Sequence, residues 1–377
     1  MPYCDCGKMK NINKEHQVIC ETNRILDLNF HSGVASGVLL ALRRKGIRFS
    51  IYAPKKIRYI FIKALAKIYY YMRYRAIVQM EWIDTHIGLL GIKINNSKPI
   101  VSFNCFGVHS RNCRNLHLYV DFMPSNYISD YLMDNSSELY RSVYLRDLRI
   151  IASARAIYFR SEFYAQFWQS RVPIANISVL PCLSNLSFLL PKPNEDTINK
   201  RRLKKNYIVL GFIGKDLQRK NLKQFLEIVR DEQRFRGIVI GCDEVTARDL
   251  YSTYLCDRVK FYGHLEKNDA TADRWDEFFR SLDFGFVCPN NEAFGLQAVE
   301  FQMFGVPVIT NYLGGLRTAC LDKSSLAFKE DDLWKSLDEI SYSEYKDMVA
   351  AGLCVWHEFS FNRVVNKLFM LGDQSPL

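Results

Sequence analysis

The chain has 377 residues, of which 48% are hydrophobic and 24% are charged, and these ordinary globular values exclude a largely disordered or collagen-like chain. At roughly 100–200 residues per domain, this length predicts two domains, each with its own core. The apolar runs are shorter than the ~18 residues that a membrane-spanning helix needs. The N-terminal sequence MPYCDCGKMK lacks the basic and apolar segments of a secretory signal, so we expect a cytoplasmic protein.

The formal net charge of +11 is concentrated in the N-terminal half. Residues 1–190 carry 25 Lys and Arg against 12 Asp and Glu, whereas residues 191–377 carry 26 against 28. The N-terminal half is therefore expected to meet an anionic partner, such as nucleic acid, a lipid surface or a phosphorylated substrate.

The first half of the chain alternates between strand-like and helix-like segments. A strand at 24–30, the glycine-rich turn HSGVASG, a helix at 37–45 and a strand at 47–53 predict a parallel βαβ unit. Further strands are expected at 77–80, 100–104, 116–121, 156–160 and 177–180. This alternation is typical of a doubly wound α/β sheet.

A change of composition follows this first sheet. Three prolines lie between 181 and 193, and the stretch 192–205 is polar and strongly basic, which marks a domain boundary near 190. The alternation then restarts, with strands expected at 207–213, 237–240, 259–262, 284–287 and 306–310, and helices at 222–230, 275–281 and 296–304. Two parallel-sheet domains of this kind are expected to bind ligands in a cleft between the carboxyl ends of their strands.

The densest chemical signal is FGFVCPNNEAFGLQAVEFQMFGVPVITNYLGGL, at 284–316. Glu292 lies in a loop after a strand, and Phe294, Gly295 and Leu296 open a helix that carries Glu300. The helix N-terminus suits a phosphate, and Gly295 lets an oxygen approach the backbone. Glu300 lies about one and a half turns into the helix, where it can bond a ribose diol, while Glu292 can accept hydrogen bonds from sugar hydroxyls. The alternative is that two surface glutamates are eight residues apart by accident.

This segment resembles a known enzyme family. The run EAFGLQAVE, followed by FGVPVI and the glycine pair Gly314 and Gly315, is similar to the Glu-x7-Glu motif of the retaining GT-B glycosyltransferases of family 4. The resemblance implies two Rossmann-like domains, with 1–190 binding the acceptor and 191–355 the nucleotide sugar. It also implies a C-terminal segment at 356–377, with a helix at about 355–370, that crosses back to the first domain.

The same resemblance assigns roles to residues of the second half. It implies that Glu300 binds the ribose and that Glu292 holds the donor sugar and takes part in catalysis. In the sequence LGFIGKDLQRKN, Lys215 stands where the family has an Arg, and Lys220 takes the place of the second cation that grips the diphosphate. A lysine lacks the bidentate fork of an arginine, and Arg219 could compensate. A solvated basic loop is the alternative.

Two further stretches correspond to parts of the family's donor site. Tyr262 and Gly263, in the sequence FYGHL, match the turn near the nucleotide base. In the first half, Gly33 is the best candidate, followed by Gly37, for the glycine-rich loop that approaches the donor phosphate. A plain βα turn would also need glycine there.

The family often has a histidine at a strand end beside the reacting sugar, and this chain departs from that pattern. The equivalent position is Val120, followed by Asp121. Either His109 takes the catalytic role or the site works without a histidine. A histidine near a strand end is often structural.

The sequence predicts neither a metal nor a cofactor. It has no Asp-x-Asp pair in the context that metal-dependent transferases use, and lysines with a helix dipole can neutralise a leaving diphosphate instead. Cys4, Cys6, His16 and Cys20 could supply four zinc ligands, but their spacing matches no common zinc pattern.

The segment that begins at Lys55 and ends at Arg75 is basic and aromatic. It holds seven basic residues, five tyrosines and no acidic residue. Such a segment can lie as an amphipathic helix on an anionic membrane, which suits a lipid-linked acceptor. It can also bind single-stranded nucleic acid, which is the less favoured reading, or pack as an ordinary helix with a solvated basic face.

The residues together predict a metal-independent retaining glycosyltransferase that moves a sugar from a nucleotide diphosphate sugar to a glycan, lipid-linked or other acceptor. Because the excess positive charge lies in the acceptor half, we expect an anionic acceptor or an anionic surface that carries it, with peripheral contact to the inner face of a membrane. The alternatives are a basic membrane- or nucleic-acid-binding protein with a degenerate GT-B fold, and a nucleotide-sugar epimerase.

Overall fold

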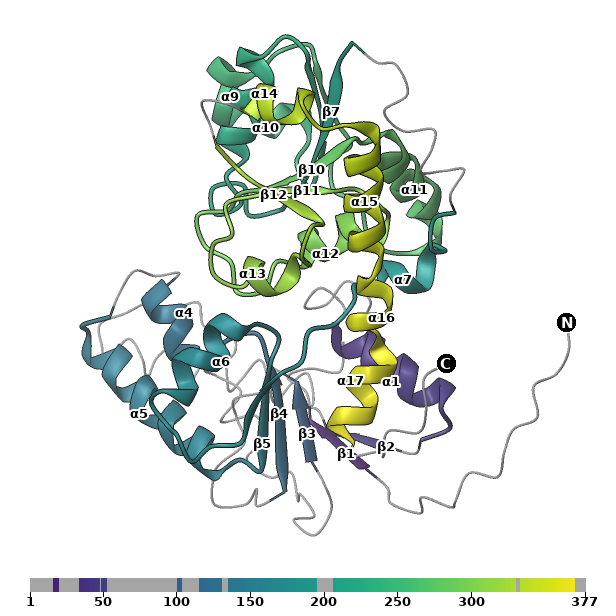
Figure 1. Cartoon of the computed structure of the whole chain (residues 1–377). Helices are drawn as coiled ribbons and strands as arrows, with labels where there is room; N and C mark the ends of the chain where they lie inside the picture. Colours follow the sequence, from purple (N-terminus) through teal and green to yellow (C-terminus); the bar gives the residue numbers. More distant parts are fainter. Residues whose placement is uncertain are drawn as a thin grey trace, which may run out of the picture.

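The computed structural model describes residues 16–19, 34–47, 49–52, 100–103, 115–130, 135–194, 206–329 and 333–369. These residues form two α/β domains, each built on a six-stranded parallel sheet (Figure 1). The expected pair of parallel sheets is confirmed. The strands predicted at 24–30 and 77–80 lie outside the described residues. Among the helices described, none is long and apolar enough to cross a membrane.

The N-terminal sheet has the strand order β2-β1-β3-β4-β5-β6. Strands β2 to β6 lie where the sequence predicts them. Strand β1 lies earlier in the chain than the first predicted strand; it is only four residues long, and it gains pairing from β2 on one side and β3 on the other. The described elements of this domain are β1 His16–Ile19, α1 Val34–Arg44, β2 Phe49–Tyr52, β3 Ile100–Phe103, β4 Leu116–Val120, α4 Pro124–Asp130, α5 Glu138–Ser153, β5 Ala156–Phe159, α6 Glu162–Gln169, β6 Ile177–Val179 and α7 Leu186–Leu189.

The C-terminal sheet has the order β12-β11-β10-β7-β8-β9, so the strand order reverses between β7 and β10. Ligands of open parallel sheets bind beyond the carboxyl ends of the strands at such a reversal. The described elements are β7 Ile208–Ile213, α9 Leu222–Asp231, β8 Phe235–Ile240, α10 Glu244–Tyr251, β9 Val259–Phe261, α11 Ala272–Ser281, β10 Phe284–Val287, α12 Leu296–Met303, β11 Val308–Thr310, α13 Leu316–Ala319, β12 Ser325–Ala327, α14 Leu333–Asp338 and α15 Tyr342–Leu353.

The C-terminal helices run from one domain to the other (Figure 1). The single helix predicted at about 355–370 is two helices, α16 Val355–Glu358 and α17 Phe361–Leu368, because the side chain of Ser360 accepts a hydrogen bond from the Arg363 amide and starts a new helix. Helix α17 packs against α1, and Lys45 Nζ donates to Asn366 Oδ1 at 3.0 Å.

Gly37 lies inside α1, not in the turn before it. A Cβ atom on Gly37 would lie 2.3 Å from the ring of Phe361, so the absence of a side chain lets α17 approach α1. The glycine is therefore explained by helix packing.

A pair of strand glycines determines how closely α12 approaches the C-terminal sheet. Gly211 of β7 and Gly285 of β10 are direct partners in the sheet register. A Cβ on Gly285 would lie 2.3 Å from Phe301 of α12, whereas one on Gly211 would lie 2.3 Å from Leu282 and 3.1 Å from Phe301. The fully buried Phe301 therefore occupies the space that a side chain on Gly285 would fill, and the buried Leu282 occupies the space beside Gly211.

We predict that Gly285→Ala lowers the free energy of unfolding by about 2 kcal/mol, because the added methyl group overpacks the contact with Phe301. Thermal unfolding should show a fall in Tm of about 5 °C. The matched control is Gly352→Ala in α15, where a Cβ would meet its nearest neighbour at 3.4 Å and helix propensity favours alanine. Equal stability of the two variants would contradict the proposed packing constraint.

Candidate functional site

The loop after β7 delivers Lys220 to the reversal point of the C-terminal sheet. The Lys220 amide donates to the Asp216 carbonyl at 2.8 Å, which closes a turn just before α9. A Cβ on Gly214 would lie 3.1 Å from Cβ and Cγ of Lys220, so the lysine stem packs directly on the glycine backbone. Lys220 is only 8% exposed.

The loop after β10 delivers Glu292 to the same place. Gly295 precedes α12 with a φ of 97°, a left-handed conformation that favours glycine, and α12 begins at Leu296 as predicted. Cβ atoms on Gly314 and Gly315 would lie 2.4 Å from the Glu292 carbonyl oxygen and 2.0 Å from the Ala293 carbonyl oxygen. The glycine pair is thus required for the close approach of this turn to the Glu292 loop.

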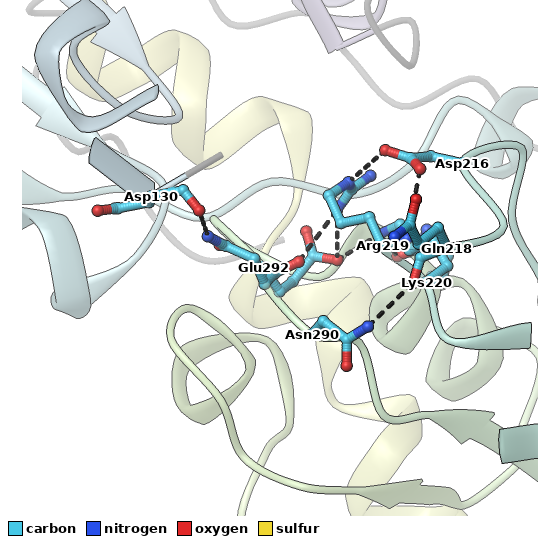
Figure 2. A network of polar contacts seen from close by, with 9 residues as sticks. Asp130, Asp216, Gln218, Arg219, Lys220, Asn290 and Glu292 are labelled. Atoms are coloured by element: carbon cyan, nitrogen blue, oxygen red, sulfur yellow. Dashed lines mark hydrogen bonds and ion pairs between the residues drawn. The ribbon is translucent and has the colours of Figure 1, made fainter. Parts of the chain in front are cut away.

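Figure 2 shows Arg219, Lys220 and Glu292 converging. The ammonium of Lys220 pairs with Glu292 Oε2 and donates to Gln297 Oε1 at 2.9 Å. Arg219 Nη1 lies 3.6 Å from Glu292 Oε2 and donates to the Asn291 carbonyl at 3.1 Å. The structure therefore brings two predicted residues, Lys220 and Glu292, into direct contact at the first turn of α12.

Burial and charge act in opposite directions on this pair. Burial lowers the pKa of Lys220 from its ordinary value, although the negative charge of Glu292 acts against the shift. Burial alone would raise the pKa of Glu292, but the positive charges of Lys220 and Arg219 outweigh it, so the pKa of Glu292 lies below its usual range. Glu292 is therefore a carboxylate at neutral pH.

Glu300 lies on α12 one turn beyond Gln297, and it is 1% exposed. Its Oε1 accepts hydrogen bonds from Ser184 Oγ and from Lys267 Nζ. Burial, with a contribution from the charge of Lys267, lowers the pKa of Lys215, which places these two lysines near each other. Cationic side chains therefore stand beside both glutamates of the motif.

The ends of β7, β8 and β9 approach one another through glycines. The Gly241 amide donates to the Gly263 carbonyl at 2.8 Å, and a Cβ on Gly241 would lie 2.2 Å from the Gly214 carbonyl oxygen. The side chain of Tyr262, in contrast, is directed to α11, where its hydroxyl donates to Glu277 Oε1 at 2.7 Å. Among the described residues, the side chain of Tyr262 makes no contact with Lys220 or Glu292.

The N-terminal domain contributes residues that touch the Glu292 loop. Asn291 Nδ2 donates to the Asp130 carbonyl at 2.6 Å (Figure 2). Arg160, directly after β5, pairs with Asp121 after β4, and its guanidinium lies 5.0 Å from the centre of the Phe294 ring. We call this region, where residues 121–130 and 160–163 meet residues 291–295 and 314–318, the domain seam.

Several predicted residues lie outside the described part of the chain. These are Gly33, His109, the segment from Lys55 to Arg75 and the zinc candidates Cys4, Cys6 and Cys20; the side chain of His16 is likewise not described. Within the described ranges no cluster of three or more His, Cys, Asp or Glu side chains could hold a metal ion.

The structure adds residues that sequence reasoning did not select. Gln297 contacts Lys220, while Ser184 and Lys267 contact Glu300. Of the residues that were not selected, Arg160 could have been found from the sequence. It directly follows the apolar strand sequence AIYF, at the carboxyl end where ligand-binding residues of parallel sheets lie.

The chain is similar to known glycosyltransferases in part of its sequence and in its fold. Residues 193–340 match the family model of glycosyl transferases group 1. An uncharacterized 41.2 kDa protein in the cps region of Klebsiella pneumoniae is 28% identical over 120 residues, 31% of each chain. D-inositol 3-phosphate glycosyltransferase of Mycobacteroides abscessus is 32% identical over 126 residues, 30% of this chain and 27% of that protein. The match thus spans less than a third of the length of these curated relatives.

Solved structures show the fold more completely. Sucrose-phosphate synthase from Thermosynechococcus elongatus has a TM-score of 0.69 at 14% identity, covering 95% of this chain and 98% of that chain. WaaG, a glycosyltransferase involved in lipopolysaccharide biosynthesis, has a TM-score of 0.58 at 13% identity, covering 95% of this chain and 100% of that chain. The chain therefore has the GT-B fold.

We predict that Glu292→Gln lowers the free energy of unfolding by about 3 kcal/mol at pH 7, because it leaves Lys220 buried without its carboxylate. The folded-state pKa of Lys220 is already lowered, so the deficit relative to the wild type is full at neutral pH and shrinks as the pH rises toward the unfolded lysine value of about 10.4. Urea unfolding of the wild type and of Glu292→Gln at pH 7 and pH 9.5 measures this difference in the free energy of unfolding.

The double variant Lys220→Met/Glu292→Gln should recover most of this stability, since it removes both charges. Glu227→Gln is the control, because Glu227 pairs with Lys223 on the surface of α9 and its loss should leave stability nearly unchanged. A deficit that is the same for Glu292→Gln and the double variant would contradict the charge argument.

Proposed function

We propose that the protein is a glycosyltransferase that moves a sugar from a nucleotide diphosphate sugar to an acceptor, because residues 193–340 match the family model of glycosyl transferases group 1 and the chain has the GT-B fold. The observation that carries the proposal is the Lys220–Glu292 pair at the first turn of α12, at the strand reversal of the C-terminal sheet. In this proposal, residues 1–190 bind the acceptor and residues 191–355 bind the donor. The C-terminal segment 356–377 crosses back to the first domain.

The donor diphosphate binds in this proposal at the start of α12. Lys220 and Lys215 supply positive charge, and the backbone around Gly295, with Phe294 and Leu296, supplies the helix N-terminus. The contacts of Lys220 support this placement. Its ammonium contacts both Glu292 and Gln297, so it can exchange one of these partners for a phosphate oxygen. Glu292 is then released to accept hydrogen bonds from the sugar hydroxyls.

The nucleoside lies along α12 in the same proposal. Glu300 binds the ribose, and Gly263 and Tyr262 belong to the turn beside the base. Among the described residues, hydrogen bonds to Glu300 go to Oε1 alone, so Oε2 can accept from a ribose hydroxyl. Lys267 then stays on Oε1 and keeps the carboxylate oriented.

The transfer proceeds with retention and without a metal in this proposal. Lys220 and Lys215 stabilise the charge that develops on the leaving diphosphate, and the amides at the start of α12 add to this stabilisation. Glu292 orients the sugar, and the role of His109 on the acceptor side stays a prediction from sequence. Contact between the domains excludes water and so suppresses hydrolysis of the donor.

The acceptor in this proposal is anionic, either a charged glycan or a lipid-linked glycan at an anionic membrane. The supporting observation is the excess of Lys and Arg in residues 1–190. Several similar proteins are named after a phosphorylated sugar or inositol, as sucrose-phosphate synthase and D-inositol 3-phosphate glycosyltransferase are. The membrane contact is assigned to the segment from Lys55 to Arg75, on the inner face of the membrane.

We predict that the protein binds one of a panel of UDP-, GDP- and ADP-sugars and that Lys220→Ala and Glu300→Ala each weaken donor binding at least tenfold, since each removes a charged ligand of the donor. Nucleotide release and calorimetry measure these effects, with Lys223→Ala, an exposed lysine on α9, as the control. A new glycoside in which the sugar keeps its anomeric configuration distinguishes transfer from epimerisation. Unchanged donor binding in both variants would show that the donor site lies elsewhere.

We further predict that EDTA leaves the rate unchanged, because lysines and a helix N-terminus, in this proposal, stabilise the leaving diphosphate. The rate is measured at saturating donor before and after dialysis against the chelator. Loss of activity that returns with added Mg²⁺ or Mn²⁺ would contradict a metal-independent mechanism.

A further inference from the structure

The junction of β5 and α6 places two polar side chains in the domain seam. Arg160 directly follows β5, and Ser161 precedes α6, which begins at Glu162. Both side chains are buried, Arg160 at 6% exposure and Ser161 at 0%. Burying an arginine and a hydroxyl on consecutive residues is unfavourable unless each has partners, so the surroundings of the two side chains indicate the function of the junction.

Arg160 is held in place but is not saturated. Asp121 pairs with its Nε, and Nη1 lies 3.9 Å from Cys182 Sγ, a weak contact. Its guanidinium faces the ring of Phe294 in the other domain. A guanidinium has five N–H donors, and among the described residues Nη2 has no hydrogen-bond acceptor. The free edge of the fork can therefore serve a ligand.

Ser161 is the second unsatisfied group. No described residue makes a hydrogen bond to its Oγ, although the atom is buried. A serine at this position usually accepts a hydrogen bond from an amide two or three residues later in its own helix, and Ser161 does not. The Glu162 amide, which follows, donates across the seam to Thr318 Oγ1 at 2.9 Å. A buried hydroxyl without a partner at a helix N-terminus, on the residue that follows Arg160, is a donor that an oxyanion can use.

We propose that Arg160 and Ser161 bind an oxyanion of the acceptor, a phosphate or a carboxylate carried on its sugar. This rests on the proposed transfer of a sugar from a nucleotide donor. Arg160 offers the bidentate fork that matches such a group, Asp121 fixes the orientation of the fork, and Ser161 donates its hydroxyl to the same anion. Phe294 lies two residues from Glu292, so an anion held here places the rest of the acceptor beside the donor sugar.

The seam explains why the site is built from buried groups. Phe294 covers the guanidinium, and Thr318 of α13 contacts the start of α6 from the other domain. An anion that binds Arg160 is thereby removed from water, where its interaction with the guanidinium is stronger than at an exposed site. Selection for an anionic acceptor over a neutral one follows, because the neutral sugar leaves these donors unpaired.

The test measures binding of small probes to the full chain by calorimetry. The probes are inorganic phosphate, glucose 6-phosphate, glucuronate and uncharged glucose at constant ionic strength. We expect phosphate and at least one charged sugar to bind, and glucose to bind at least tenfold more weakly than that charged sugar. Glucose 6-phosphate and glucuronate separate a phosphate-bearing acceptor from a carboxylate-bearing one.

The key variant is Asp121→Asn/Arg160→Gln, which neutralises the pair without leaving a lone buried charge. It should weaken binding of the charged sugar at least tenfold, and Ser161→Ala should weaken it a few-fold. If the double variant unfolds, Arg160→Lys, which keeps the charge and loses the fork, should still show a several-fold loss. The control is Arg155→Gln, since Arg155 is exposed and bonds Asn115 away from the seam.

Equal affinity of the charged sugar for the wild type and for the Arg160 and Ser161 variants would overturn the proposal. So would a loss of the same size in Arg155→Gln, because it would reflect the general charge of the domain. If no nucleotide sugar is bound but anion binding still depends on Arg160, the proposed transferase function fails while the anion site stands.

Discussion

The packing of Phe301 against Gly211 and Gly285 is the constraint on which the candidate site depends. It brings α12 against the two strands between which the order of the C-terminal sheet reverses. The start of α12 is thereby set beside the end of β7, where Lys220 is delivered. A larger residue at Gly285 would push α12 outward, and Lys220 and the Glu292 loop would no longer meet.

The buried ion pair is better understood as preparation for a ligand than as a source of stability. A buried pair such as Lys220–Glu292 contributes little net stability, because desolvation offsets most of its Coulomb attraction. Its value is that both charges are already removed from water and already oriented. A ligand with an anionic part and a hydroxyl-bearing part can take one partner each, which is the chemistry of a diphosphate joined to a sugar.

The predictions that succeeded depend on short stretches of sequence. The parallel strands are near-continuous apolar runs, and the start of α12 is marked by one glycine within a nine-residue motif. The features that were not predicted depend on distant partners. Strand β1 has only four residues and is stabilised by the neighbouring strands on both sides. Gly37 leaves room for the ring of Phe361, which lies more than 300 residues later in the chain. Lys267 and Ser184 were missed for the same reason, since only the folded chain brings them to Glu300.

The contacts of Glu300 connect the candidate donor site to the segments that join the two domains. Ser184, which bonds Glu300, lies in the chain that leads from the first domain, and its neighbour Leu183 donates a backbone hydrogen bond to the Phe359 carbonyl at 2.8 Å, between α16 and α17. Both crossing segments therefore meet within one residue of the Glu300 contact. In the proposed donor complex the ribose binds Oε2, so the Ser184 bond to Oε1 stays in place and the ribose meets a carboxylate that is already fixed to the segment joining the two domains.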